Sequence, residues 1–160
     1  MKKFFFENRI NFLFLFISLL CLVSMQGMEN ISPFSIKWTH TADKFNRDPA
    51  IYQTAWYFFL NDIWRFPLGS NPNYGMGISS SIVISDTIPI LSFFFKSLKL
   101  FIPENFQYFS FWFFVCFYFQ LFFSFKILNK FTNSVSYSLI GSFFFLIAPI
   151  FLYRLQWHHA

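Results

Sequence analysis

Three long runs without a charged residue constrain the fold of this 160-residue chain more than any other feature. They cover residues 10–28, 105–125 and 131–153, and a charged residue bounds each run on both sides. About 20 apolar residues cross the hydrocarbon core of a bilayer, and a helix is the open-chain structure that satisfies the backbone there. The runs therefore predict an all-α integral membrane protein with three transmembrane helices.

The composition agrees with lipid as the surrounding medium. The chain is 56% hydrophobic and 12% charged, whereas a soluble domain carries about 25% charged residues. The net charge is +5, but Lys and Arg are scattered and form no basic face, so no nucleic acid is expected as a partner. Cys21 and Cys116 both lie in the apolar runs, where cysteine behaves as a small hydrophobe.

Basic residues predict the orientation of the three spans. Lys2, Lys3 and Arg9 precede the first run, and Lys126 and Lys130 lie between the second and the third. The positive-inside rule places residues 1–9 and the loop 126–130 in the cytoplasm, so that residues 29–104 and the tail 154–160 lie outside.

The first run has a second interpretation. A cleaved signal peptide has the same basic and apolar pattern, but no small-x-small cleavage site follows this run, which favours an uncleaved anchor.

Residues 82–102 are a fourth candidate span, interrupted by Asp86, Pro89, Lys96 and Lys99. A fourth span would turn Lys126 and Lys130 outward, against the positive-inside rule. In a helix over residues 88–102, apolar residues share one side, and Ser92, Lys96 and Lys99 share the other. This pattern predicts an amphipathic helix in the membrane interface, with snorkelling lysines.

A second juxtamembrane helix is predicted over residues 49–65. Asp48 followed by Pro49 is a helix-start signal, and Pro67 with Gly69 ends the pattern. An apolar stripe with helical spacing follows the start, formed by Tyr52, Ala55, Trp56, Phe59, Leu60 and Ile63. The passage "NPNYGMGISSSIVISDTIP" then connects the two helices, and its glycines permit tight turns.

Several polar residues of this outer loop are candidates for chemistry. Asp48 is either a helix cap or a carboxylate presented for general-base or metal chemistry. Asp86 is either a cap or turn residue, or a second acid. Arg47 and Arg65 either anchor the loop at the interface or bind a phosphate.

Other polar residues carry weaker signals. Asp43 and Asp62 are expected to be solvated. His158 and His159 are a weak metal signal, because adjacent residues of a helix point in different directions.

The segments "DPAIYQTAWYFF", "WRFPLGSNPNYG", "SSIVISDTIPIL", "FQYFSFW" and "YRLQWHHA" resemble the start of a bacterial multispanning family, domain of unknown function 6311. The resemblance covers residues 47 to 160. The layout is also similar to that of GT-C membrane glycosyltransferases, which have many more spans. We therefore expect the chain to be a fragment of a bacterial inner-membrane protein, and such a fragment to be inactive alone.

The similarity to the GT-C glycosyltransferases implies transfer of a sugar from a polyprenyl-phosphate donor to a cell-envelope acceptor. By position it assigns Asp48 as the candidate base and Asp86 as a second acid for positioning or for a divalent cation. It also assigns Arg47 or Arg65 to the donor phosphate, and it gives His158 and His159 no defined role.

Two other classes of protein fit the same three spans. A polytopic transporter or flippase for a lipid-linked substrate is expected to carry intramembrane charges, and these runs contain none. In a non-catalytic membrane protein, Asp48 and Asp86 would affect only stability.

Overall fold

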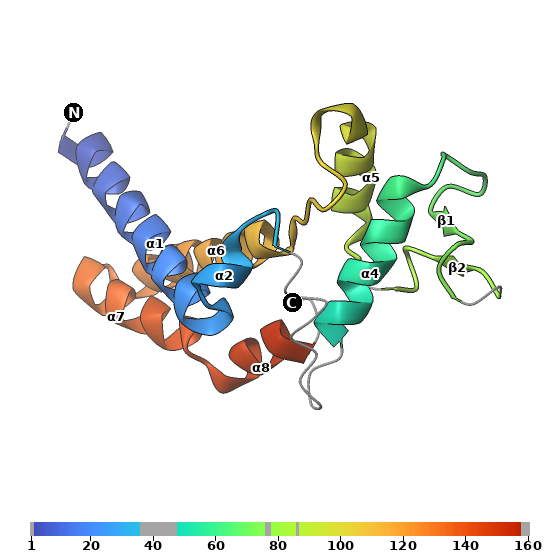
Figure 1. Ribbon diagram of the computed structural model, residues 1–160. Helices are drawn as coiled ribbons and strands as arrows, with labels where there is room; N and C mark the ends of the chain where they lie inside the picture. The colour runs from blue at the N-terminus through green and yellow to red at the C-terminus, as the bar shows by residue number, and fades with distance from the viewer. Residues whose placement is uncertain (1, 36–47, 76–77, 86, 158–160) are drawn as a thin grey trace. The chain divides into compact units, whose positions relative to one another are not determined.

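The computed structural model describes residues 2–35, 48–75, 78–85 and 87–157. The described part is mostly helical, as expected, with one two-stranded hairpin (Figure 1). It divides into two compact units, which we treat separately. Unit 1 contains residues 2–31 and 109–155, and unit 2 contains residues 32–108 with residues 156–157.

Unit 1 is built from helices only. Its elements are α1 (Lys2–Gln26), α2 (Met28–Ile31), α6 (Phe109–Thr132), α7 (Val135–Leu146) and most of α8 (Pro149–Trp157). Two segments are long and apolar enough to cross a membrane: Asn8–Gln26 of α1 and Phe109–Thr132, which is the whole of α6.

The third predicted span, residues 131–153, is not one helix. α6 continues to Thr132, and Asn133 then turns the chain with a positive φ of 50°. α7 has 12 residues, about 18 Å of helix, against a hydrocarbon core of about 30 Å. Pro149 starts α8; it lacks an amide hydrogen and disfavours helical geometry at Ala148, so the two helices are separate.

α1 and α6 pack antiparallel through matching stripes. Ile10, Phe14, Ser18 and Leu22 are buried on α1, and Phe113, Phe117, Leu121 and Phe125 are buried on α6. Phe14 and Phe125 meet edge to face at 5.5 Å between ring centroids. At the other end, Ser110 Oγ donates to the carbonyl of Asn30 at 2.7 Å. The start of α1 and the end of α6 therefore lie at the same end of unit 1.

α7 packs against α6 through small side chains. Ser138 and Ser142 are fully buried, and their hydroxyls donate to the carbonyls of Ser134 and Leu139 within α7. A Cβ atom at Gly141 would come within 2.5 Å of Leu128 on α6. Small residues let helix backbones approach closely, which is the usual way that helices associate in membranes.

Unit 2 lies between the two candidate spans in the sequence. Its elements are α4 (Asp48–Asn61), β1 (Ser70–Asn71), β2 (Ser80–Ser81), α5 (Pro89–Ser97) and the 3-10 turn η1 (Lys99–Phe101). β1 and β2 pair antiparallel, with Ser70 opposite Ser81. Each of the two segments predicted as a juxtamembrane helix contains a helix, but each helix is shorter than expected, since α4 ends at Asn61 and α5 at Ser97. Their place at the membrane stays a prediction.

The apolar stripe of α4 forms the core of unit 2. Five of its six predicted members are buried: Tyr52, Ala55, Trp56, Phe59 and Leu60. Ile63 follows the end of the helix and is exposed. Trp56 contacts Tyr108 edge to face at 4.9 Å, and its Nε1 donates to the carbonyl of Phe106 at 2.8 Å. α4 is therefore attached to the segment that precedes α6.

The first and last segments of unit 2 are joined to each other. Gln107 donates from its backbone amide to the carbonyl of Pro33 and from Nε2 to the carbonyl of Ser32, both at 2.7 Å. Asn105 Nδ2 donates to the carbonyl of Phe34 at 3.1 Å. The chain therefore enters and leaves unit 2 at one place, which we call the clasp (residues 32–34 and 105–107).

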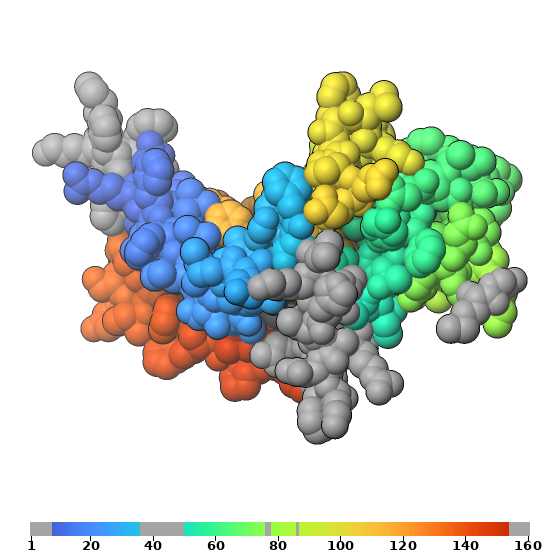
Figure 2. Space-filling view, viewed as in Figure 1, coloured from blue at the N-terminus to red at the C-terminus, as the bar shows by residue number. Residues whose placement is uncertain are grey.

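The amphipathic segment α5–η1 turns two of its three predicted polar residues inward, and the third, Lys99, is exposed. Ser92 and Lys96 are buried, whereas Leu100 and Phe101 are 94% and 86% exposed, and Ile90 and Phe94 are also exposed. Figure 2 shows the segment (yellow) beside α4 (turquoise). The expectation that Lys96 snorkels to the interface is wrong, because Lys96 lies in the interior of unit 2.

Candidate functional site

The structure describes only part of the predicted site. Arg47, Asp86, His158 and His159 lie outside the described residues. Asp48 is the first residue of α4, but its side chain is outside the description. Whether these residues lie close to one another therefore stays a prediction. The described residues next to them define the geometry of this region.

Arg65 is the one predicted site residue whose side chain is described, and it forms an ion pair. Its Nε donates to Asp62 Oδ2 at 2.8 Å, and its Nη2 donates to Asp62 Oδ1 at 3.1 Å. Asp62 Oδ1 also accepts from the backbone amide of Ile63, which fixes the carboxylate at the end of α4. The expectation that Asp62 is solvated is wrong, because its carboxylate is paired with Arg65 and its side chain is 6% exposed.

The pair leaves part of the guanidinium accessible. The side chain of Arg65 is 40% exposed and that of Asp62 is 6% exposed. The hydrogen bonds from Arg65 lower the pKa of Asp62, and the same contact raises the pKa of Arg65. Asp62 therefore orients a permanent cation whose side chain stays partly exposed.

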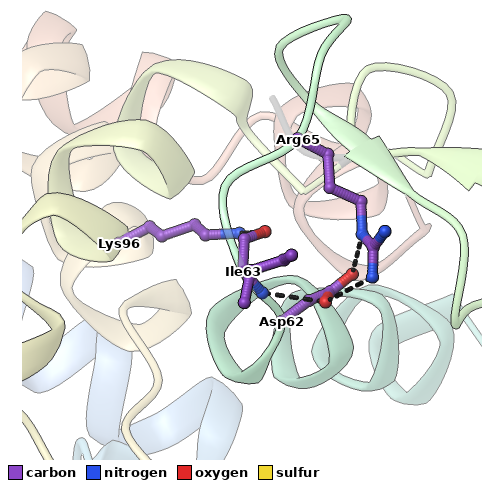
Figure 3. A network of polar contacts seen from close by, with 4 residues as sticks. All are labelled: Asp62, Ile63, Arg65 and Lys96. Atoms are coloured by element: carbon purple, nitrogen blue, oxygen red, sulfur yellow. Dashed lines mark hydrogen bonds and ion pairs between the residues drawn. The ribbon is translucent and has the colours of Figure 1, made fainter.

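Lys96 is a second cation beside this pair (Figure 3). It is 2% exposed, and its Nζ donates to the carbonyl of Ile63 at 3.2 Å. The same ammonium lies 3.7 Å from the ring centroid of Phe59 and 4.9 Å from that of Trp64. Ring faces attract a cation, so these contacts offset part of the loss of water.

Burial lowers the pKa of Lys96 to about 8. The negative charge of Asp62 acts in the opposite direction, and the positive charges of Lys99 and Arg65 add to the lowering. Sequence reasoning placed Lys96 on the polar face of its helix, but it could not indicate that this face packs against α4. The sequence signal for this burial was the pair of aromatic residues Phe59 and Trp64, because aromatic rings attract a cation.

The residues on both sides of Asp86 are held in place. Thr87 is fully buried, and its Oγ1 donates to the carbonyl of Ile82 at 2.9 Å. The hydroxyls of Ser92 and Tyr108 both donate to the carbonyl of Thr87. Burial raises the pKa of Tyr108, which keeps it a neutral donor. The chain leading into α5 is therefore anchored directly after Asp86.

The connecting passage is also attached to α4, through Asn71. This side chain is fully buried, and its Nδ2 donates to the carbonyl of Ala55 at 2.8 Å. Its Oδ1 accepts no hydrogen bond from any described atom. Sequence reasoning counted Asn71 as a loop residue, whereas it is part of the interior of unit 2.

The described residues contain no group of three or more His, Cys, Asp or Glu side chains that could hold a metal ion. The predicted acids Asp48 and Asp86 are outside that search, so a divalent cation at this site stays a prediction.

Two helices able to cross a membrane, with a folded unit between them in the sequence, define the chain as a candidate membrane protein. The family model described as "Domain of unknown function (DUF6311)" matches residues 15–160. The chain belongs to this family, as its sequence segments predicted. No curated protein and no solved structure matches it.

Proposed function

We propose that this chain serves a membrane glycosyltransferase-like activity, in which a sugar passes from a polyprenyl-phosphate donor to a cell-envelope acceptor. The observation that carries the proposal is unit 2, a folded unit between two candidate spans that presents an oriented, accessible Arg65. In this proposal the chain lies in a bacterial inner membrane, with its N-terminus in the cytoplasm and unit 2 outside.

The chemistry assigns complementary tasks to the residues. Asp48, at the start of α4, removes the proton from the acceptor hydroxyl as that oxygen attacks the sugar. The bond from the sugar to the lipid phosphate breaks, and negative charge develops on the phosphate. Arg65 stabilises this charge. Arg47 is a second candidate phosphate contact, and Asp86 positions the acceptor or a cation.

The surface of unit 2 supports a place at the bilayer. Its interior holds polar side chains such as Asn71, Thr87 and Lys96, while Leu100 and Phe101 are almost fully exposed. Large exposed apolar side chains are typical of surfaces that meet a membrane or another protein. A lipid-linked donor would reach a site in unit 2 from that surface.

A transfer assay with the purified full-length protein and a polyprenyl-phosphate-linked sugar tests the proposal. We expect Asp48→Ala to lower kcat at least about 100-fold, because general-base catalysis contributes roughly 10²–10⁴ in rate. We expect Arg65→Gln to raise the KM for the donor, whereas Lys99→Gln leaves both constants unchanged. Asp48→Asn separates the base from the cap, since asparagine also caps helices.

Transfer by Asp48→Ala and Asp48→Asn at the wild-type rate would refute the proposed base. Loss of thermal stability in Asp48→Ala, with full activity in Asp48→Asn, would reduce Asp48 to a helix cap and favour a non-catalytic role.

A further inference from the structure

A cavity of about 410 Å³ lies in unit 1 along the second half of α6. Residues of α6, α7 and α8 form its walls, among them Phe119, Phe123, Ile127, Phe145 and Phe151. Residues 116 to 128 of α6 line it, which is about 18 Å of helix. That length is more than half of a hydrocarbon core of about 30 Å.

The polar side chains in the wall are already bonded within unit 1. Gln120 Nε2 donates to the carbonyl of Phe145 at 3.3 Å, and Ser124 Oγ donates to the carbonyl of Leu121 at 3.1 Å. Water needs two to four polar partners to occupy a cavity. This cavity offers few, so a hydrocarbon chain fits it better than water does.

Two exposed lysines lie close in sequence to the part of α6 that lines the cavity. Phe123, Ile127 and Lys130 follow one another at spacings of four and three, so they share one face of α6. Lys130 is exposed, one turn beyond Ile127. Lys126 is also exposed, and its Nζ lies 5.2 Å from the ring centroid of Phe122. Lys130 therefore lies one turn beyond Ile127, on the face of α6 that lines the cavity.

Acidic residues are scarce around this end. No Asp or Glu follows Glu104 in the sequence. Arg9 near the start of α1, which lies at the same end of unit 1, is exposed and adds another positive charge. The described charges near this end of α6 are therefore positive.

We propose that this cavity holds an acyl chain of an anionic glycerophospholipid of the bilayer, with the lipid phosphate against Lys130. The shape and the charge of the site carry this assignment together: an apolar cavity along a candidate span, with an exposed ammonium one helical turn beyond Ile127 in its wall. Basic positions at the end of membrane helices attract anionic lipids by about 1 kcal/mol per residue, which is about fivefold in affinity.

Native mass spectrometry of the full-length protein in detergent tests the site. Phosphatidylglycerol and phosphatidylcholine with identical acyl chains are added at equal concentration. We expect the protein to retain phosphatidylglycerol about fivefold better, and Lys130→Gln to bring the ratio close to one. Lys99→Gln, which removes an exposed lysine of unit 2, should leave the ratio unchanged.

A second pair of variants tests the cavity itself. Ile127 lines it and Ile140 does not, and each is 58% exposed. We expect Ile127→Trp to lower retention of both lipids, because the larger ring fills the opening, and Ile140→Trp to behave as wild type. Equal retention of both lipids, or an unchanged preference in Lys130→Gln, would overturn the assignment. Preferential retention of a lipid with an isoprenoid chain over both phospholipids would also overturn the assignment.

Discussion

Lys96 shows what a single residue contributes to this fold. A helical wheel separates the polar from the apolar side of α5, and this separation could be predicted from the sequence. It does not indicate which side meets the rest of unit 2. The polar side is buried because Ile63 offers a carbonyl, and because Phe59 and Trp64 offer ring faces to the ammonium. The partners come from α4 and the segment after it, so periodicity within α5 could not reveal them.

The burial of Lys96 makes the stability of the protein depend on pH. The folded-state pKa is about 8, whereas the ordinary value is 10.5, so the unfolded chain binds more protons between these values. We therefore expect the free energy of unfolding to rise above pH 8, by up to about 1.4 kcal/mol per pH unit. Below pH 8 the full cost of burying the charge is present.

Chemical unfolding of the full-length protein between pH 7 and 9.5, followed by tryptophan fluorescence, measures this dependence. Lys96→Met should abolish the rise, while Lys99→Met, at an exposed position, should keep it. A wild-type curve that is flat above pH 8 would contradict the buried position of Lys96.

At the scale of elements, the apolar stripes along helices could be predicted from the sequence, but the positions at which helices are interrupted could not. The stripe on α4 is buried as expected, because helical spacing of Trp56, Phe59 and Leu60 is a local property of the sequence. The run 131–153 contains no charge, yet Asn133 and Pro149 bound a short α7. A search for runs without charge finds apolar segments, whereas the length of each helix depends on backbone geometry at residues such as Asn133 and Pro149. The small residues Ser138, Gly141 and Ser142, of which the two serines are buried, were the sequence signal for helix contact that charge counting missed.

Gly141 sets the distance between α6 and α7. A Cβ there would meet Leu128 Cδ1 at 2.5 Å, the far end of a flexible side chain. We expect Gly141→Ala to be tolerated after rotation of Leu128, and Gly141→Leu to destabilise the protein by about 1–3 kcal/mol through overpacking.

Thermal unfolding in detergent distinguishes these variants. Ser136→Leu, at an exposed position of the same helix, serves as the control and should melt with the wild type. In Gly141→Ala, the further change Leu128→Ala should not improve the melting temperature. A Gly141→Leu variant as stable as the wild type would contradict the close packing of α6 and α7 at Gly141.

At the scale of the whole molecule, antiparallel packing of α1 and α6 agrees with the predicted topology. Arg9 near the start of α1, and Lys126 and Lys130 near the end of α6, lie at one end of unit 1. The positive-inside rule predicts these residues on one side of the membrane, and which side they occupy stays a prediction. The assembly of the site could not be tested in this way, because most of its predicted residues lie outside the described part.

Labelling of single cysteines tests the orientation. In a chain with Cys21→Ala and Cys116→Ala, we expect a membrane-impermeant maleimide to label Asn73→Cys in intact spheroplasts. Phe131→Cys should react only after permeabilisation. Both positions are exposed in the fold, so access depends on the membrane side. Labelling of position 131 alone in intact spheroplasts would reverse the topology.

The clasp gives unit 2 the character of an insert. Because residues 32–34 and 105–107 are hydrogen-bonded to each other, the first and last segments of unit 2 lie next to each other. A module with adjoining ends can be exchanged between proteins at little cost in loop entropy. A lineage could therefore replace unit 2 while leaving the paired helices α1 and α6 of unit 1 intact.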